Sequence, residues 1–124
     1  MTLQRDGSLQ DAMDLQELLI RVDNDRDLVI ELIAIFKKKY PPLLLLLQES
    51  IACQDTNRVE TTSHALRGML SCLSASRAVA LAKRLEQMGR DGKTWEMTDL
   101  LTLFENELAN LMPELDEYST KVEL

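Results

Sequence analysis

Apolar residues that recur at alternating steps of three and four constrain this chain most, because that spacing places them along one side of an α-helix. The seam predicts a helix from Trp95 onward, bent near its end by Pro113, and it is typical of helices that pack in bundles. The residues of the seam are Met97, Leu101, Phe104, Leu108, Leu111 and Leu115.

A second series predicts one long helix from about residue 25 to 53. Its apolar members are Leu28, Val29, Leu32, Phe36, Leu43, Leu47 and Ile51. The series keeps its phase across Pro41 and Pro42, although each proline removes a backbone donor and crowds the carbonyl four residues earlier. We therefore expect a kink or restart near Tyr40 in a helix that keeps its direction.

Aspartates in front of the apolar series predict where three helices begin. Asp14, with Glu17 three residues later, satisfies the unpaired N–H groups of a first turn and predicts a short helix. Asp25 can cap the long helix, and Asp55 or Thr56 can cap the one that follows it.

The helix that begins near residue 55 is predicted to end at about Leu73, where Ser74 or Ser76 can cap a further helix. That further helix is predicted to run to Met88 and to be stopped by glycine. The glycines are Gly89 and Gly92, and the predicted buried residues are Ala78, Leu81, Leu85 and Met88.

Together these elements predict an all-α fold, an antiparallel four-helix bundle with a short additional N-terminal helix. A length of 124 residues with 45% hydrophobic content suits a single domain over 1–124, with its core at about 14–118. Aromatic residues make up only 4% of the chain, which favours packed helices over strands. Because this content is adequate for a closed bundle, we expect a monomer.

Charge and composition argue against several classes of function. The net charge of −7 disfavours binding to nucleic acid or anionic lipid, so a protein partner is expected. The N-terminus has no apolar run of signal-peptide length, and the five leucines at 43–47 fall far short of the roughly 20 residues that span a bilayer. A cytoplasmic protein is therefore predicted. Cys53 and Cys72 lack metal-type spacing and are expected to be reduced, partly buried thiols.

The only histidine, His64, is predicted to lie on the polar side of its helix. Its neighbours on a helical surface are Glu60, Thr61, Arg67, Gly68 and Ser71. The inward side carries Val59, Thr62, Ser63, Leu66, Met69, Leu70 and Leu73. Glycine in a helix interior costs roughly 1 kcal/mol relative to alanine, so Gly68 is expected to provide space beside the imidazole. Arg67 adds a cation whose donors suit phosphate oxygens.

Other chemistries account less well for this pattern. A lone histidine on a helix is usually only solvated, but that interpretation gives no reason for the glycine. A di-iron bundle needs two Glu-x-x-His pairs, and no acidic residue is clearly placed to complete a triad with His64 and Ser63 or Ser71. No glycine-rich ATP loop is present, so the chain is not expected to phosphorylate itself, and no metal site is predicted.

Basic residues gather around the histidine in an otherwise acidic chain. Between Asp55 and Lys93 there are seven basic and four acidic residues, a local charge of +3. The remainder carries seven basic and seventeen acidic residues, a charge of −10. This distribution suits a phosphoryl group or an acidic pocket on a partner.

The stretch "HALRGMLSCLSA", from His64 on, resembles the signature of histidine-containing phosphotransfer (HPt) domains, which runs His-x-Leu-Lys/Arg-Gly, then small residues, an aliphatic residue, Gly and Ala. The segment 25–68 is similar to the family's long second helix, with its proline, and to the entry of its histidine helix. "LAKRLEQMGRDG" is similar to the next helix. The resemblance covers residues 14 to about 112; Met69 departs from a usual small residue and Ser74 from a usual glycine.

The resemblance implies a role for four residues. His64 would be phosphorylated, Arg67 would be the cation beside the phosphoryl group, and Gly68 would be the gap that admits the partner. Glu86, twenty-two residues after the histidine, would bond the other ring nitrogen, which fixes the tautomer and raises the nucleophilicity of the ring.

The implied activity is that of a carrier, not of an enzyme with its own kinase activity. His64 would take a phosphoryl group from the aspartyl phosphate of a response-regulator receiver domain, or from a sensor (hybrid) histidine kinase, and pass it to another receiver. Mg²⁺ would belong to the receiver, so no cofactor is expected here. Candidate docking residues are Glu60, Thr61, Ser71, Lys83, Arg90, Leu45 and Leu46.

Two alternatives of other classes remain at this stage. The chain could be a helical-bundle adaptor, or a degenerate phosphotransfer-like domain, that binds a signalling partner without carrying phosphate. The run of five leucines could instead make it a dimerisation module. The presence of both His64 and Gly68 favours the carrier.

Overall fold

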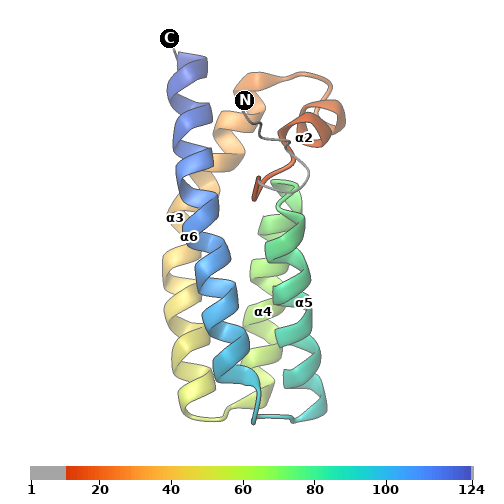
Figure 1. The fold of residues 1–124 in the computed structure, drawn as a ribbon, viewed down its shortest axis with the longest axis vertical. Coiled ribbons are helices and arrows are strands. Elements are labelled where there is room, and N and C mark those ends of the chain that lie inside the picture. Colours follow the sequence, from red (N-terminus) through yellow and green to blue (C-terminus); the bar gives the residue numbers. More distant parts are fainter. Residues whose placement is uncertain (1–10, 124) are drawn as a thin grey trace, which may run out of the picture.

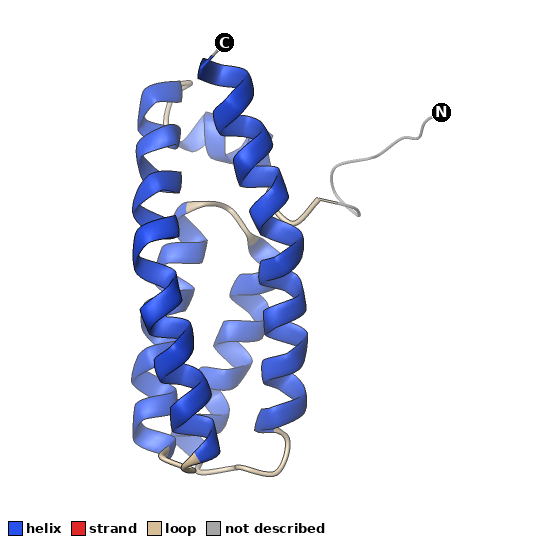
Figure 2. Cartoon of the chain, turned by 90° about the vertical axis from the view of Figure 1, so that its left-hand side faces the viewer, coloured by secondary structure: helices blue, strands red, loops and turns tan. Residues whose placement is uncertain are grey.

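The computed structural model describes residues 11–123, with side chains for 11–120. Within that range it contains five helices and no strand (Figures 1 and 2). They are α2 (Leu15–Arg21), α3 (Arg26–Ala52), α4 (Thr56–Cys72), α5 (Ser76–Asp91) and α6 (Met97–Glu123). The four long helices form an antiparallel bundle, with the short α2 beside one end of it (Figure 1). The predicted all-α bundle is therefore confirmed, while the predicted lack of a signal-peptide run concerns residues 1–10, which lie outside the described range.

Three helices begin after aspartates: Asp14 and Asp25, as the sequence predicted, and Asp55, which the sequence offered together with Thr56. The carboxylates of Asp14, Asp25 and Asp55 each accept a hydrogen bond from the backbone N–H three residues later, at 3.0, 3.0 and 3.1 Å. Each bond satisfies a donor that has no partner within its helix.

The start of α5 differs from the prediction, because Ala75 is its N-cap and no side chain caps it. Ser74 instead adopts a left-handed conformation with φ of 54°, which explains why a glycine suits this position. Its hydroxyl accepts a hydrogen bond from Arg21 Nη1 at 2.8 Å, and its carbonyl accepts one from the Asp14 N–H at 3.0 Å. The turn between α4 and α5 thus holds α2 in place.

Helix α3 runs without a break through Pro41 and Pro42. Both prolines are exposed, so water can reach the carbonyls that lose their helical donors. Figure 1 shows the first part of α3 inclined to the rest. The buried line of the helix passes through Val29, whereas Leu28, which the apolar series also includes, is 37% exposed. Two adjacent apolar residues fit the spacing equally well, and packing selects one of them.

The C-terminal end of α5 and the start of α6 also differ from the prediction. Helix α5 continues through Gly89 to Asp91 and ends where Gly92 takes the left-handed conformation, with φ of 70°. Helix α6 begins at Met97, and Trp95 lies in the preceding turn with 71% of its surface exposed. The seam residues of α6 are buried, apart from Leu101, which is half-buried.

The core runs the length of the bundle and receives side chains from every helix. Its largest fully buried members are Phe36, Phe104, Leu18, Ile33, Leu47, Leu66, Leu70, Leu73, Leu85, Met97, Leu111 and Leu115. In the described range no helix combines the length and apolar character needed to cross a bilayer. Cys53 and Cys72 are both exposed, contrary to the prediction of partial burial, because each lies at the end of its helix outside the buried stripe.

Candidate functional site

The polar side of α4 lies as the sequence predicted. The His64 side chain is 65% exposed, whereas Ser63 and Leu66 are fully buried on the opposite side of the helix. A Cβ atom built on Gly68 would meet no atom within 4 Å, so the space beside this glycine is open. Thr61 is exposed, and both Glu60 and Ser71 are half-buried at the edge of the same surface.

Across from His64, α5 brings in a buried carboxylate. Glu86 is 6% exposed, and among residues 11–120 it is the one charged residue that is buried. Its Oε2 lies 2.9 Å from His64 Nδ1, and its Oε1 accepts a hydrogen bond from Arg67 Nε at 2.7 Å. Helix packing therefore joins two residues of α4 to one of α5, as the resemblance implied for Glu86 and His64.

The Glu86 carboxyl is ionised in spite of its burial. Burial by itself raises its pKa, but the hydrogen bonds and charge interactions with Arg67 and His64 together outweigh that effect. The pKa of Glu86 consequently lies below its ordinary value of 4.5. At neutral pH the site therefore contains a fixed negative charge behind the imidazole.

The imidazole nitrogen Nδ1 has two neighbours that compete for it. Glu86 Oε2 and Arg67 Nη2 both lie 2.9 Å from Nδ1, and the first can only accept a hydrogen bond while the second can only donate one. If Nδ1 carries the proton, it donates to Glu86, and the lone pair of the neutral ring is then on Nε2. Both polar contacts of the ring within the described residues are made by Nδ1, so Nε2 lies on the side open to a reactant.

Arg90 adds a second guanidinium to the Glu86 carboxylate. Its Nη2 lies 3.4 Å from Glu86 Oε2, and its Nε donates to Glu60 Oε2 at 2.9 Å. The hydrogen bond to Glu60 is the main reason that the pKa of Arg90 is raised. The sequence predicted Arg90 only as a docking residue. The available signal was the spacing of four that separates Glu60 from His64 and Glu86 from Arg90 on two antiparallel helices.

Gly89 brings α4 and α5 close together beside this cluster. A Cβ atom at this position would lie 2.7 Å from the Glu60 backbone nitrogen and 2.8 Å from the Thr56 carbonyl oxygen. No residue larger than glycine fits without a shift of one helix. The close approach aligns Glu60 with Arg90. Gly89, which the sequence predicted as a helix stop, instead lies inside α5 and allows α4 to pack closely against it.

The remaining predicted docking residues lie at other positions on α5 and α3. Lys83 is exposed on α5, Leu45 is 55% exposed on α3, and Leu46 is half-buried. Helix α3 packs against α4, so the leucine run belongs to the neighbour of the histidine helix.

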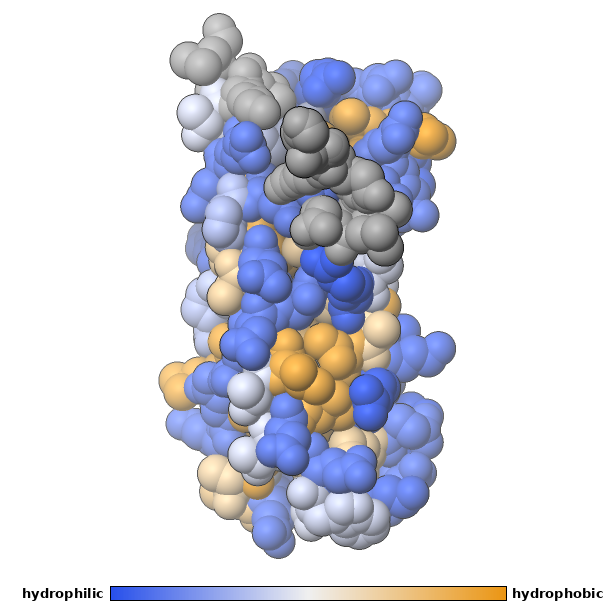
Figure 3. All heavy atoms as spheres, in the orientation of Figure 1, coloured by the Kyte–Doolittle hydropathy of each residue, from blue (hydrophilic) through white to orange (hydrophobic). Residues whose placement is uncertain are grey.

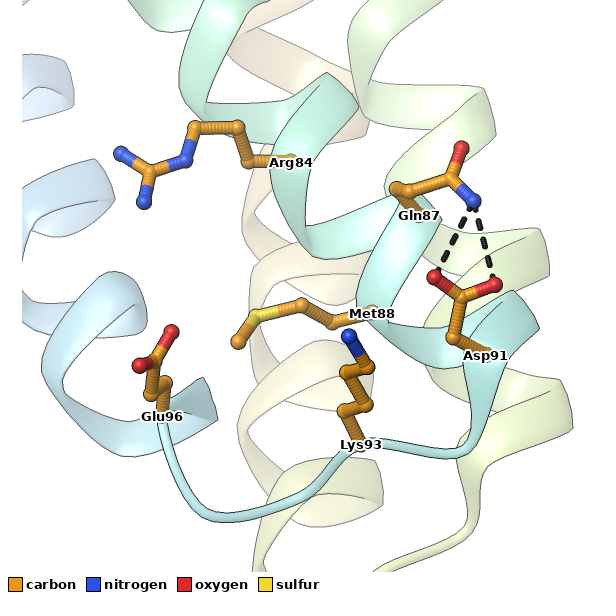
Figure 4. A pocket seen from close by; sticks show the side chains of 6 residues that line it. All are labelled: Arg84, Gln87, Met88, Asp91, Lys93 and Glu96. Atoms are coloured by element: carbon orange, nitrogen blue, oxygen red, sulfur yellow. Dashed lines mark hydrogen bonds between the residues drawn. The ribbon is translucent and has the colours of Figure 1, made fainter.

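The face that α5 and α6 form together is a different surface. Figure 3 shows hydrophobic side chains on it, and a shallow hollow nearby is lined by Arg84, Gln87, Met88, Asp91, Lys93 and Glu96 (Figure 4). In Figure 4 Arg84 extends toward the side of Glu96 and α6. None of the predicted site residues lines this hollow. Within the described residues there is also no group of three His, Cys, Asp or Glu side chains placed to hold a metal ion.

The geometry suits nucleophilic chemistry at Nε2. An exposed imidazole is held from behind at Nδ1, a guanidinium lies beside it, and open space follows at Gly68. A carboxylate behind the ring stabilises positive charge that develops on it when Nε2 attacks an electrophile.

Comparison with known families agrees with the bundle and its histidine helix. The sequence model of the Hpt domain matches residues 31–118, which is well over half of the chain and includes every predicted site residue. Among curated proteins and solved structures, none is significantly similar to this chain.

Proposed function

Because this chain belongs to the Hpt domain family, we propose that it accepts a phosphoryl group on His64 and exchanges it with the aspartate of a response-regulator receiver domain. Hpt domains carry out histidine phosphotransfer in two-component phosphorelays, and they interact with receiver domains and sensor kinases. The observation that carries the proposal for His64 is the contact between its Nδ1 and the buried Glu86 carboxylate, which directs Nε2 outward.

The transfer step conserves the proton on Nδ1. Nε2 of His64 attacks the phosphorus of the receiver's aspartyl phosphate, so the Nε2–P bond forms while the P–O bond breaks. The electron pair of that bond returns to the receiver's aspartate as a carboxylate. The ring then carries a positive charge, which the adjacent Glu86 carboxylate balances. Passing the phosphoryl group to another receiver reverses these steps.

Arg67 and Gly68 supply the surroundings of the phosphoryl group in this proposal. The Arg67 side chain is 30% exposed and its guanidinium borders the ring, so it can donate to phosphoryl oxygens. The open space at Gly68 admits the backbone of the partner. Mg²⁺ and the acid residues that hold it belong to the receiver domain, and this chain needs no cofactor and no ATP site of its own.

The receiver docks on the exposed side of α4 in this proposal. Thr61 and the edges of Glu60 and Ser71 surround the histidine, and the exposed Leu45 with Leu46 adds apolar contact from α3. The exposed cation Lys83 complements an acidic receiver pocket. A sensor kinase that bears such a receiver is the expected donor.

Incubation with a panel of phosphorylated receiver domains tests the proposal. We expect transfer of phosphate to the wild-type chain in a form that is labile in acid and stable in base. The His64→Gln variant should take up none, while its free energy of unfolding stays within about 0.5 kcal/mol of wild type because the side chain is exposed. Specific binding of receivers without any transfer would instead identify an adaptor.

A further inference from the structure

The Glu86 carboxylate is held by two guanidinium groups, and they differ in how they can move. Arg67 approaches Oε1 from α4, one turn after His64, and also reaches the ring nitrogen. Arg90 approaches Oε2 from α5 itself, one turn after Glu86. The first borders the space that the phosphoryl group would occupy. The second contacts Oε2, the oxygen that faces His64, and is tied to Glu60.

Arg67 cannot keep its present contacts while the histidine reacts. When Nδ1 carries its proton and donates to Glu86, Arg67 Nη2 faces an N–H group instead of a lone pair and must turn away. If its guanidinium moves to the phosphoryl oxygens, Glu86 also loses its 2.7 Å partner. A buried carboxylate without a countercharge is high in free energy, so Glu86, which is 6% exposed, would then tend to take up a proton.

Arg90 is placed to limit this loss, because its Nη2 lies 3.4 Å from Glu86 Oε2. Its hydrogen bond to Glu60 at 2.9 Å is independent of the histidine and of Arg67, so it persists when Arg67 turns. We propose that Arg90 is a positioning residue that keeps the Glu86 carboxylate charged and directed at Nδ1 while Arg67 engages the phosphoryl group. This inference rests on the proposed function and deepens it, because it assigns Arg90 to the nucleophile instead of to docking.

The packing of the two helices supports the assignment independently. The approach at Gly89 lies next to Arg90 in sequence and against Glu60 in space, where a Cβ atom would be 2.7 Å from the Glu60 nitrogen. The helices therefore approach each other closely where the pair forms, and this contact favours the register that aligns Glu60 with Arg90 and His64 with Glu86.

The state of the imidazole tests the inference without any phosphate. Because His64 is the only histidine, ¹⁵N NMR at pH 8 reports the share of the Nδ1–H tautomer from one residue. We expect Arg67→Ala to keep that tautomer dominant, since Arg90 still holds Glu86. Combining Arg67→Ala with Arg90→Gln should lower the Nδ1–H share well beyond the sum of the single changes. An unchanged share in the double variant would overturn the inference.

Phosphorylation by phosphoramidate separates positioning from docking. This small donor loses ammonia as the Nε2–P bond forms and requires no partner protein. We expect Arg90→Gln to slow the reaction roughly five-fold, which corresponds to about 1 kcal/mol, and Arg90→Lys to recover part of the rate. In a Glu86→Gln background, Arg90→Gln should have no further effect, because the positioning acts through the carboxylate.

The control is Arg84→Gln, the same change of charge on the same helix at a residue that points toward α6 (Figure 4). It should leave the rate at the wild-type value, and circular dichroism should show unchanged helix content in every variant. Equal slowing by Arg90→Gln with and without Glu86 would assign Arg90 a direct effect on the donor and overturn the inference. If the wild-type chain takes up no phosphate at all, the proposed function fails, whereas the NMR measurement still decides the role of Arg90.

Discussion

At the scale of single residues, the charge of Glu86 depends on its partners. Burial opposes the ionised form, and the hydrogen bonds from Arg67 and His64 favour it more strongly, so the pKa of this carboxyl falls below 4.5. Arg90 faces the same carboxylate from α5. A group with a lowered pKa stabilises the fold above its unfolded pKa and loses that contribution as the pH falls through its folded pKa.

Stability should therefore depend on pH through Glu86. The difference in unfolding free energy between wild type and Glu86→Gln should be largest at neutral pH and should shrink as the pH falls below about 4.5, where the unfolded chain binds its proton first. Urea unfolding at a series of pH values from 7 to 3 measures this difference. A difference that is constant over the series would show that Glu86 contributes no linkage.

Gly68 supports a second prediction at this scale, on the rate of transfer. The open space beside Gly68 would be filled by a long side chain that covers the imidazole from one turn away. We expect Gly68→Gln to slow phosphotransfer from a receiver at least about ten-fold while helix content stays unchanged, an effect on the scale of 1.4 kcal/mol. Transfer at the wild-type rate would mean that the glycine does not provide clearance for the partner.

At the scale of elements, the contact between α4 and α5 creates the site. Two glycines on these helices have opposite surroundings: nothing lies near a Cβ atom at Gly68, whereas backbone atoms of α4 lie within 3 Å of one at Gly89. The space beside Gly68 is open, whereas the space beside Gly89 is occupied by the backbone of α4.

The same substitution should thus change stability in opposite directions at the two glycines. Gly68→Ala should stabilise the fold by up to about 1 kcal/mol through helix propensity. Gly89→Ala should destabilise it by about 1–3 kcal/mol, because one helix must shift to admit the methyl group. Thermal and urea unfolding of the two variants measure both signs, and stabilisation by Gly89→Ala would disprove the close contact.

Sequence patterns predict elements of this kind where the local signal is complete. The caps at Asp14 and Asp25 and the seam of α6 need only nearby residues, and the structure confirms them, with Leu101 half-buried; of the two candidates for the third cap it selects Asp55. The glycine pattern predicts a helix stop at Gly89, which is wrong because a glycine in a sequence does not reveal whether it ends a helix or admits another one. The prediction of Ser74 or Ser76 as a cap is also wrong. The left-handed conformation of Ser74 depends on the turn to which α2 is attached, and the local sequence does not show that contact.

At the scale of the whole molecule, the bundle accounts for what was predictable about the site. The orientation of His64, Arg67 and Gly68 follows from the period of one helix, so the sequence was sufficient for it. The path from His64 through Glu86 and Arg90 to Glu60 crosses between two helices twice. Its register depends on packing. For that reason only the resemblance pointed to Glu86, and the spacing of four from Glu60 to His64 and from Glu86 to Arg90 does not by itself show that the two pairs face each other.

The bundle should be monomeric at micromolar concentration. Its core is closed by side chains from every described helix, and the exposed leucines, such as Leu45 and Leu103, are 55% and 52% exposed on different helices. Sedimentation velocity should show one species of 14.1 kDa. A tight dimer that Leu45→Glu dissociates would favour a dimerisation module instead.

The central claim is that Nδ1 is held by the protein and that Nε2 of His64 carries the phosphoryl group. Two-dimensional ¹H–³¹P NMR of the ¹⁵N-labelled chain, phosphorylated by a receiver domain, identifies the nitrogen that is bonded to phosphorus. Because the chain has a single histidine, the assignment is unambiguous. The account predicts phosphorus on Nε2 with the proton retained on Nδ1, and phosphorus on Nδ1, or on any residue other than His64, would contradict it.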